Sequence, residues 1–138
     1  MRPCRDTFLH FIADNLGGGI SVHAKRCDPN DPAADQLQVN AVNIYFLDIE
    51  LDQIAVETAV IDVINNDENT AVDWVTALWT ILHAAYFTPL LDYTVPASPV
   101  PAGGNVIWDR KKIRFKRISK DDNYCHLSCV LPLRFTAA

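Results

Sequence analysis

The sequence predicts an α+β fold, in which an antiparallel or mixed sheet of four to five strands is packed by two helices. Residues 37–64 are rich in β-branched side chains, residues 124–135 place apolar side chains at every second position, and segments 4–16 and 70–87 repeat apolar residues at helical spacing. These three observations carry the prediction. The chain has 138 residues, of which 49% are hydrophobic, which is enough for one domain spanning 1–138 with its own core.

The first predicted elements are a helix over 4–16 and a short strand over 20–24. Gly17, Gly18 and Gly19 separate them, and glycine commonly follows the last turn of a helix. In the strand, apolar residues alternate with polar ones, which indicates a half-buried strand. Residues 28–36 form a polar, proline-bearing loop.

A long acidic hairpin is predicted over 37–64. Its two strands turn near Asp52, and Asp48, Glu50 and Asp52 alternate with apolar residues just before that turn. The hairpin tip is therefore strongly acidic.

A capped helix is predicted over 70–87. Thr70 and Asp73 have the spacing of a capping box, and the helix ends ahead of Pro89. Because this helix is apolar almost all round, it needs cover on both sides, either from its own domain or from another subunit. We expect the second, which makes Trp79 a candidate interface residue.

The last third of the chain contains a loop and a hairpin. Residues 88–105 hold four prolines and predict a long irregular loop, which either reaches to a neighbouring subunit or lies free on the surface. Residues 106–118 and 124–135 then predict two antiparallel strands. Pro132 indicates that the far end of the second strand lies at a sheet edge or a bulge.

Charge is unevenly distributed. The net charge of −5 arises from 17 acidic and 12 basic residues, yet there is no Lys or Arg between Cys27 and Trp108, and seven basic residues fall within 110–120. Such segregation indicates contact with a polyanion or with another copy of the chain, and the simpler alternative is a solvated strand face. The candidate interface residues in this basic segment are Arg110, Lys111, Lys112, Arg114 and Lys116.

Other function classes receive less support from the sequence. Trp108 and Phe115 interleave with the basic segment as a stacking platform for nucleic acid requires, but the pI of about 5.2 is unlike that of typical nucleic-acid-binding domains. The histidines lie on separate predicted elements, and no phosphate-binding loop or nucleophile elbow is present. We expect no catalytic residue, metal or cofactor. We also expect no membrane span and no signal peptide, hence a cytoplasmic protein.

The order of the elements resembles that of the tail-terminator (tail-completion) proteins of tailed bacteriophages, the family that includes the minor tail protein U of lambda-like phages. The resemblance is carried by the alternating segment 39–46, the helix over 70–87 and the turn at 121–124, and it spans nearly the whole chain. The proline loop and the concentrated basic strand depart from the family pattern. They leave open a related head–tail connector or neck (head-completion) protein.

The resemblance implies a virion structural protein without catalytic residues. In this family a ring, typically of six copies, caps the finished tail tube, stops its polymerisation and offers a surface to the neck or connector proteins. The protein would then be assembled in the host cytoplasm and reside at the head–tail junction. DNA would pass through the lumen without specific binding, and Asp48, Glu50 and Asp52 are candidate lumen residues that repel its phosphates.

Overall fold

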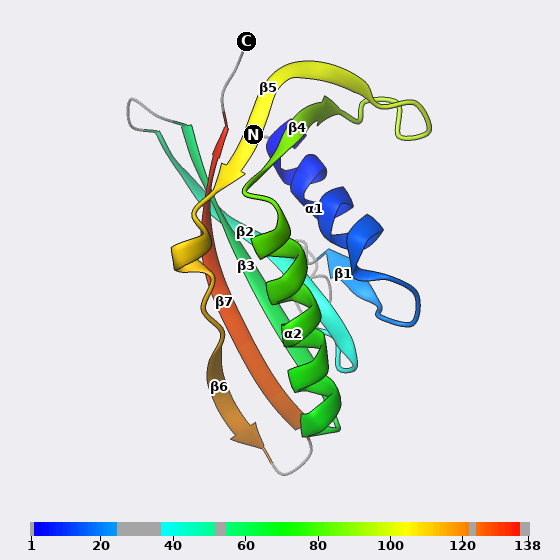
Figure 1. Ribbon diagram of the computed structural model, residues 1–138, viewed down its shortest axis with the longest axis vertical. Helices are drawn as coiled ribbons and strands as arrows, with labels where there is room; N and C mark the ends of the chain where they lie inside the picture. Colours follow the sequence, from blue (N-terminus) through cyan, green and yellow to red (C-terminus); the bar gives the residue numbers. More distant parts are fainter. Residues whose placement is uncertain (1, 25–36, 52–54, 122–123, 136–138) are drawn as a thin grey trace, which may run out of the picture.

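Two helices pack against one curled sheet (Figure 1). The computed structural model describes residues 2–24, 37–51, 55–121 and 124–135. The predicted α+β class is confirmed, although these residues form seven strands instead of four to five. The elements are α1 (Arg2–Leu16), β1 (Val22–Ala24), β2 (Ala41–Leu51), β3 (Ala55–Asn65), α2 (Glu68–Ala84), β4 (Phe87–Asp92), β5 (Val100–Trp108), the 3₁₀ helix η2 (Arg110–Lys112), β6 (Lys116–Asp121) and β7 (Tyr124–Phe135).

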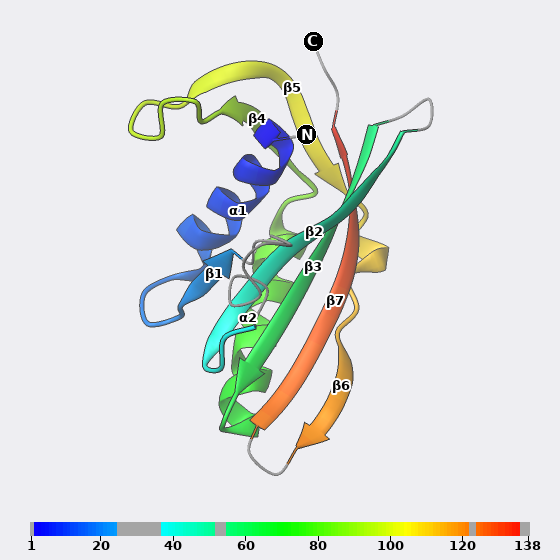
Figure 2. The same cartoon turned by 180° about the vertical axis from the view of Figure 1, so that it is seen from behind.

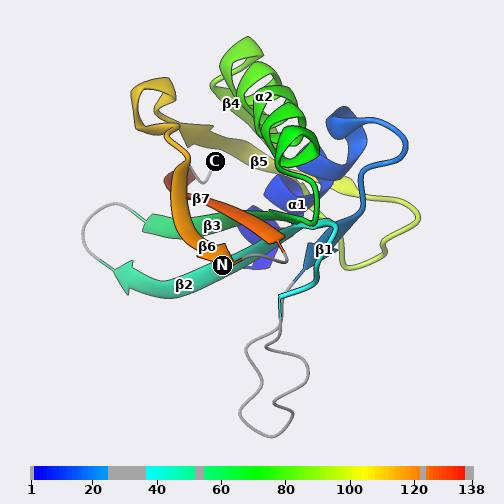
Figure 3. The same cartoon turned by 90° about the horizontal axis from the view of Figure 1, so that it is seen from below.

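The sheet is mixed and has the strand order β1-β2-β3-β7-β5-β4, with β6 also paired to β7. β1 runs parallel to β2, and the other pairs are antiparallel. Both helices lie on the same side of the β2–β3–β7 layer (Figure 3), and the opposite side carries no helix (Figure 2). The sheet therefore has a helix-covered inner face and an outer face that is available for other contacts.

The hydrophobic core lies between the helices and the inner face of the sheet. Phe8 and Ile12 of α1 and Leu78 and Leu82 of α2 are fully buried there. The indole Nε1 of Trp108 donates a hydrogen bond to the carbonyl oxygen of Leu82 at 2.9 Å, which satisfies a buried polar group that would otherwise be costly. This contact fixes the end of β5 against α2.

The predicted acidic hairpin is confirmed as β2 and β3, which pair as far as Leu51 and Ala55. Asp48 and Glu50 lie on β2, close to the end of the hairpin. Asp52, the third residue of the predicted acidic tip, lies outside the described residues.

Helix α2 begins two residues earlier than predicted. Asp67 is its N-cap, because the Asp67 carboxylate accepts hydrogen bonds from the Thr70 backbone N–H at 3.2 Å and from the Thr70 hydroxyl at 2.6 Å. The predicted capping box of Thr70 and Asp73 is therefore wrong. The helix ends at Ala84 instead of residue 87, because the chain then enters β4.

The prediction of an irregular loop over 88–105 is wrong for most of its length. Pro89 lies in β4 and Pro101 lies in β5, whereas Pro96 and Pro99 lie in the segment that joins these two strands. β4 is the edge strand of the sheet, where a proline costs no ladder hydrogen bond on its free side. The Thr7 hydroxyl accepts from the Leu91 N–H at 3.0 Å and donates to the Leu91 carbonyl at 3.2 Å. The His10 and Tyr93 rings stack with centroids 4.0 Å apart. Strand β4 is thus fastened to α1 of the same chain.

The predicted strand over 106–118 is interrupted. β5 ends at Trp108, and the Asp109 carboxylate then accepts a hydrogen bond from the Lys111 N–H at 2.9 Å, which caps the short helix η2. The chain resumes strand pairing at Lys116. The basic residues therefore project from a turn as well as from a strand.

The predicted strand over 124–135 is confirmed as β7. Pro132 pairs with Thr58 of β3 on one side of β7, so it does not lie at an outer edge of the sheet. The predicted edge exists only on the other side of β7 at this position. On the other side of β7, pairing with β6 reaches Ser128 and pairing with β5 begins at Leu133. Within the described chain, the stretch between these two residues has no second strand beside it.

Candidate interaction groove

A groove opens on the outer face of the sheet, where the segment that links β5 to β7 crosses the gap between the β5 and β6 pairings. The groove has a volume of about 480 Å³. We call it the basic groove, and it is lined by Lys111, Lys112, Arg114, Lys116, Ile118, Ser128, Val130 and Pro132. Half of these residues are cations and none is an acid.

Local chain geometry gathers these cations. The turn at η2 brings Lys111 and Lys112 to one end of the groove, and β6 carries Lys116 along its wall. Ile113 is buried in the core, which anchors the segment between them. Burial raises the pKa of the Cys129 thiol, and a backbone hydrogen bond from Arg114 opposes that rise. The bond also ties this segment to β7.

The floor of the basic groove is apolar. Val130 is 55% exposed and Ile118 is 59% exposed, so both present hydrocarbon to solvent between the cationic side chains. Pro132 continues this floor into an adjoining hollow of about 220 Å³, which also contacts Arg134 and Asp109. A ligand for this surface therefore needs negative charge together with apolar groups.

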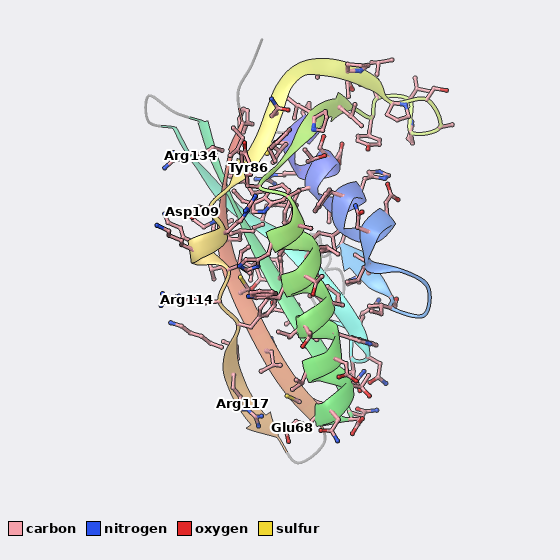
Figure 4. All side chains as sticks on the ribbon, in the orientation of Figure 1. Glu68, Tyr86, Asp109, Arg114, Arg117 and Arg134 are labelled. Atoms are coloured by element: carbon pink, nitrogen blue, oxygen red, sulfur yellow. The ribbon has the colours of Figure 1, made fainter. Side chains whose placement is uncertain are left out.

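Two neighbouring basic residues are engaged elsewhere. The Arg117 guanidinium forms an ion pair with Glu68 at the start of α2, and this carboxylate raises the pKa of Arg117 through a hydrogen bond and through its charge. The Arg110 guanidinium lies over the Tyr86 ring, 5.1 Å from its centroid. Figure 4 shows Arg117 near Glu68 at one end of α2, and Tyr86 near the other end.

The sequence-predicted interface residues therefore divide into three groups. Lys111, Lys112, Arg114 and Lys116 come together in the basic groove, whereas Arg110 is turned toward Tyr86 and Trp79 lies on α2. The indole of Trp79 is 50% exposed and stacks on the ring of His83, with centroids 3.8 Å apart. Asp48 and Glu50 lie on β2 and are not among the residues that line the groove of their own chain.

Sequence analysis missed the floor of the groove. Ser128, Val130 and Pro132 share the face of β7 opposite to the buried Cys129 and Leu131. The alternation along β7 places these three residues on one face. The sequence does not show that the basic residues lie beside this face, because that depends on the path of the chain from β5 through η2 to β6.

A buried polar pair lies on the same outer face. Nε2 of His126 is 2.9 Å from Oδ1 of Asp62, and the two side chains are 13% and 3% exposed. Among the described residues, Oδ2 of Asp62 has no hydrogen-bond partner. His126 and Ser128 are two residues apart on β7, so they share a strand face, and Asp62 pairs with Ser128 across the strands. The sequence does not show which aspartate lies beside His126, because Asp62 is 64 residues away along the chain.

The stacking platform proposed for nucleic acid is not formed. Trp108 is only 3% exposed, and its indole N–H is bonded inside the core. Phe115 packs against the core as well. Neither ring of the sequence-predicted pair therefore offers the open aromatic face that base stacking needs.

Metal sites and membrane spans were sought in the same described residues. There, no group of three or more His, Cys, Asp and Glu side chains is placed to hold a metal ion. No described helix combines the length and apolar character needed to cross a membrane.

No protein-family model matches this sequence, and no curated protein matches it significantly.

Proposed function

We propose that this chain is a structural protein of the head–tail junction of a tailed phage. Specifically, it is a tail terminator that forms a ring, expected to contain six copies, on the end of the tail tube. In that role it stops tube polymerisation in the host cytoplasm and offers an attachment surface to the neck proteins. DNA passes through the central channel of the ring without specific binding.

The observation that carries the proposal is the concentration of positive charge on one surface of an acidic chain. The basic groove gathers four cations with no acid among its lining residues, while the sequence from Asp28 to Ile107 contains no Lys or Arg at all. A cationic surface on a chain of net charge −5 favours contact with an acidic part of another copy, and heterologous, head-to-tail contacts close into rings when the rotation permits.

A second surface supports assembly. Helix α2 buries Ala71, Leu78 and Leu82 against its own domain, but Val72 and Trp79 on its other side are about half exposed. An exposed tryptophan is enriched in protein interfaces, because it supplies a large contact area at little conformational cost. We assign this side of α2 to contacts within the particle.

A tube-growth assay tests the proposal. The tail tube protein of the same phage is polymerised in the presence of this chain, and tube lengths are measured by electron microscopy. The proposal expects short tubes, each ending in a ring. Tubes of unchanged length without rings contradict it, and rings bound to the head portal instead identify a neck protein.

The α2 surface has its own matched comparison. Trp79→Lys should reduce ring assembly while circular dichroism remains that of the parent, because the side chain is half exposed in the single chain. Val39→Lys changes an apolar residue of similar exposure just before β2 and serves as the control. Equal assembly of the two variants contradicts the role assigned to Trp79.

A further inference from the structure

We infer that the basic groove is the receptor for the acidic β2–β3 hairpin of a neighbouring copy. The inference rests on the proposed ring, and it names the contact that joins one copy to the next. Asp48 and Glu50 are thereby assigned to the subunit interface instead of to the lumen.

Chemical complementarity selects this occupant. Residues 47–51 read Leu-Asp-Ile-Glu-Leu, an alternation of apolar and acidic residues. The basic groove offers partners for both kinds of side chain, with lysines and an arginine at its walls and the exposed Val130 and Ile118 on its floor. Charge pairs at the walls give specificity and apolar contact at the floor gives affinity.

The hairpin is placed to reach another copy. β1 pairs with β2 only from Val42 to Ile44, so among the described residues the rest of β2 has no strand along its outer edge, and the end of the hairpin points away from β6 (Figures 1 and 2). The groove lies between η2 and β6, near Ser128 to Pro132. Leu47 pairs with Thr58, and Thr58 pairs with Pro132 of the groove floor, so the hairpin is held beside the groove within one sheet and the hairpin that enters the groove belongs to another copy.

Nucleic acid fits the groove less well. The whole chain carries a net charge of −5, which repels a polyanion at long range. Trp108 and Phe115, the two aromatic residues that interleave with the basic segment in the sequence, pack against the core and offer no open ring face to bases. A short acidic segment of protein is repelled less at long range, because it carries only a few charges. It also needs no stacking rings, because its apolar side chains can contact the groove floor.

Charge reversal on each side of the contact tests the inference. The groove variant combines Lys111→Glu, Lys112→Glu and Arg114→Glu, and the hairpin variant combines Asp48→Lys and Glu50→Lys. Each variant alone sets like charges against each other, so association should weaken about 100-fold or more. An equimolar mixture of the two should form rings again, with the variants alternating around an even-numbered ring. Native mass spectrometry resolves the mixed species by mass.

Control variants reverse one charge of each sign elsewhere on the chain. Arg110→Glu reverses a neighbouring cation that does not line the groove, and Asp14→Lys reverses an exposed acid outside the hairpin. These controls should assemble as the parent does. Circular dichroism and thermal unfolding establish that every variant is folded, and a salt titration of the parent ring provides a measurement without any variant. The dissociation constant of the parent ring should rise steeply with salt.

The possible outcomes separate the two proposals. If the parent forms rings, and both reversed variants form the same rings with unchanged salt dependence, the groove inference is overturned while the proposed ring stands. If the parent itself never assembles, on the tube or in solution, the proposed function fails first. If a DNA duplex binds the parent at low salt and the groove variant loses only that binding, the groove is a nucleic-acid site and the inference is wrong.

Discussion

The ion pair between Arg5 and Glu57 should be the most sensitive electrostatic contact within the single chain. The Arg5 Nε lies 2.8 Å from Glu57 Oε2, and the Glu57 side chain is fully buried whereas that of Arg5 is 35% exposed. The same guanidinium lies over the Phe46 ring, 5.3 Å from its centroid, and its Nη2 is 3.4 Å from the Leu47 carbonyl oxygen. Arg5 thus joins α1 to β2 and β3 in the half of the hairpin nearer its turn.

Replacing Arg5 with methionine keeps the apolar stem but takes the guanidinium from a buried carboxylate. At a charge separation of about 4 Å and an effective dielectric constant of about 20, the lost attraction is about 4 kcal/mol. Removing one partner of a buried pair typically costs about 3–5 kcal/mol. Because Arg5 is partly in water, we take the lower end, about 3 kcal/mol. For a chain of this size, this corresponds to a fall in melting temperature of about 12 °C.

The assay is thermal and urea unfolding of three variants followed by circular dichroism. Glu57→Gln leaves Arg5 free to turn toward water and should cost only about 1 kcal/mol. Arg117→Met breaks the exposed ion pair with Glu68 and should leave the melting temperature almost unchanged. The reasoning is refuted if Arg5→Met is no more destabilising than Glu57→Gln, or if it matches the exposed control.

Three further predictions follow from local contacts. Asp67→Ala should lower the stability of α2. Hydrogen bonds from Thr70 hold the pKa of Asp67 below its ordinary value of 3.8, so the cap should contribute stability above that pH and lose it below. Melting temperatures of parent and variant that differ by the same amount down to pH 2 would contradict this. Burial raises the pKa of Cys4 to about 11 and also raises the pKa of Cys129, so both thiols should resist iodoacetamide at pH 8 until the chain is unfolded. Peptide mapping by mass spectrometry measures this, and rapid labelling of either thiol in the native protein would refute it. Thr7→Val removes the reciprocal hydrogen bonds with Leu91 and should speed hydrogen exchange in β4 without changing it in β7, whereas uniform exchange rates would show that this contact does not hold β4.

Sequence periodicity predicted the elements in which one face is buried. The strand over 124–135 was predicted with the bounds that the structure has, because the burial of Cys129, Leu131 and Leu133 requires the strict alternation visible in the sequence. The hairpin over 37–64 and the helix over 4–16 were likewise predicted close to their observed bounds.

The errors occur where tertiary contacts override local signals. The prolines of 88–105 predicted a loop, yet this segment pairs as an edge hairpin that is fastened to α1 through Thr7 and His10. The long predicted strand was broken because one carboxylate, that of Asp109, caps a helical turn after Trp108. Neither contact leaves a periodic signal in the sequence.

The candidate site was only half visible in the sequence. The cluster of cations within 110–120 is evident from composition, but the sequence does not show that Arg110 turns to Tyr86, that Arg117 pairs with Glu68, or that four others surround an apolar floor. These assignments depend on which face of β7 the turn at η2 crosses, which is a property of the assembled sheet.

The central claim is that copies of this chain associate with one another through their charged and apolar surfaces. The mass of the parent protein in solution tests this claim most directly. Multi-angle light scattering across a wide concentration range should find a discrete assembly, expected at six copies of 15.4 kDa, about 92 kDa, that dissociates as salt is added. A particle of 15.4 kDa at every concentration, both alone and in the presence of tail tubes, would contradict the account.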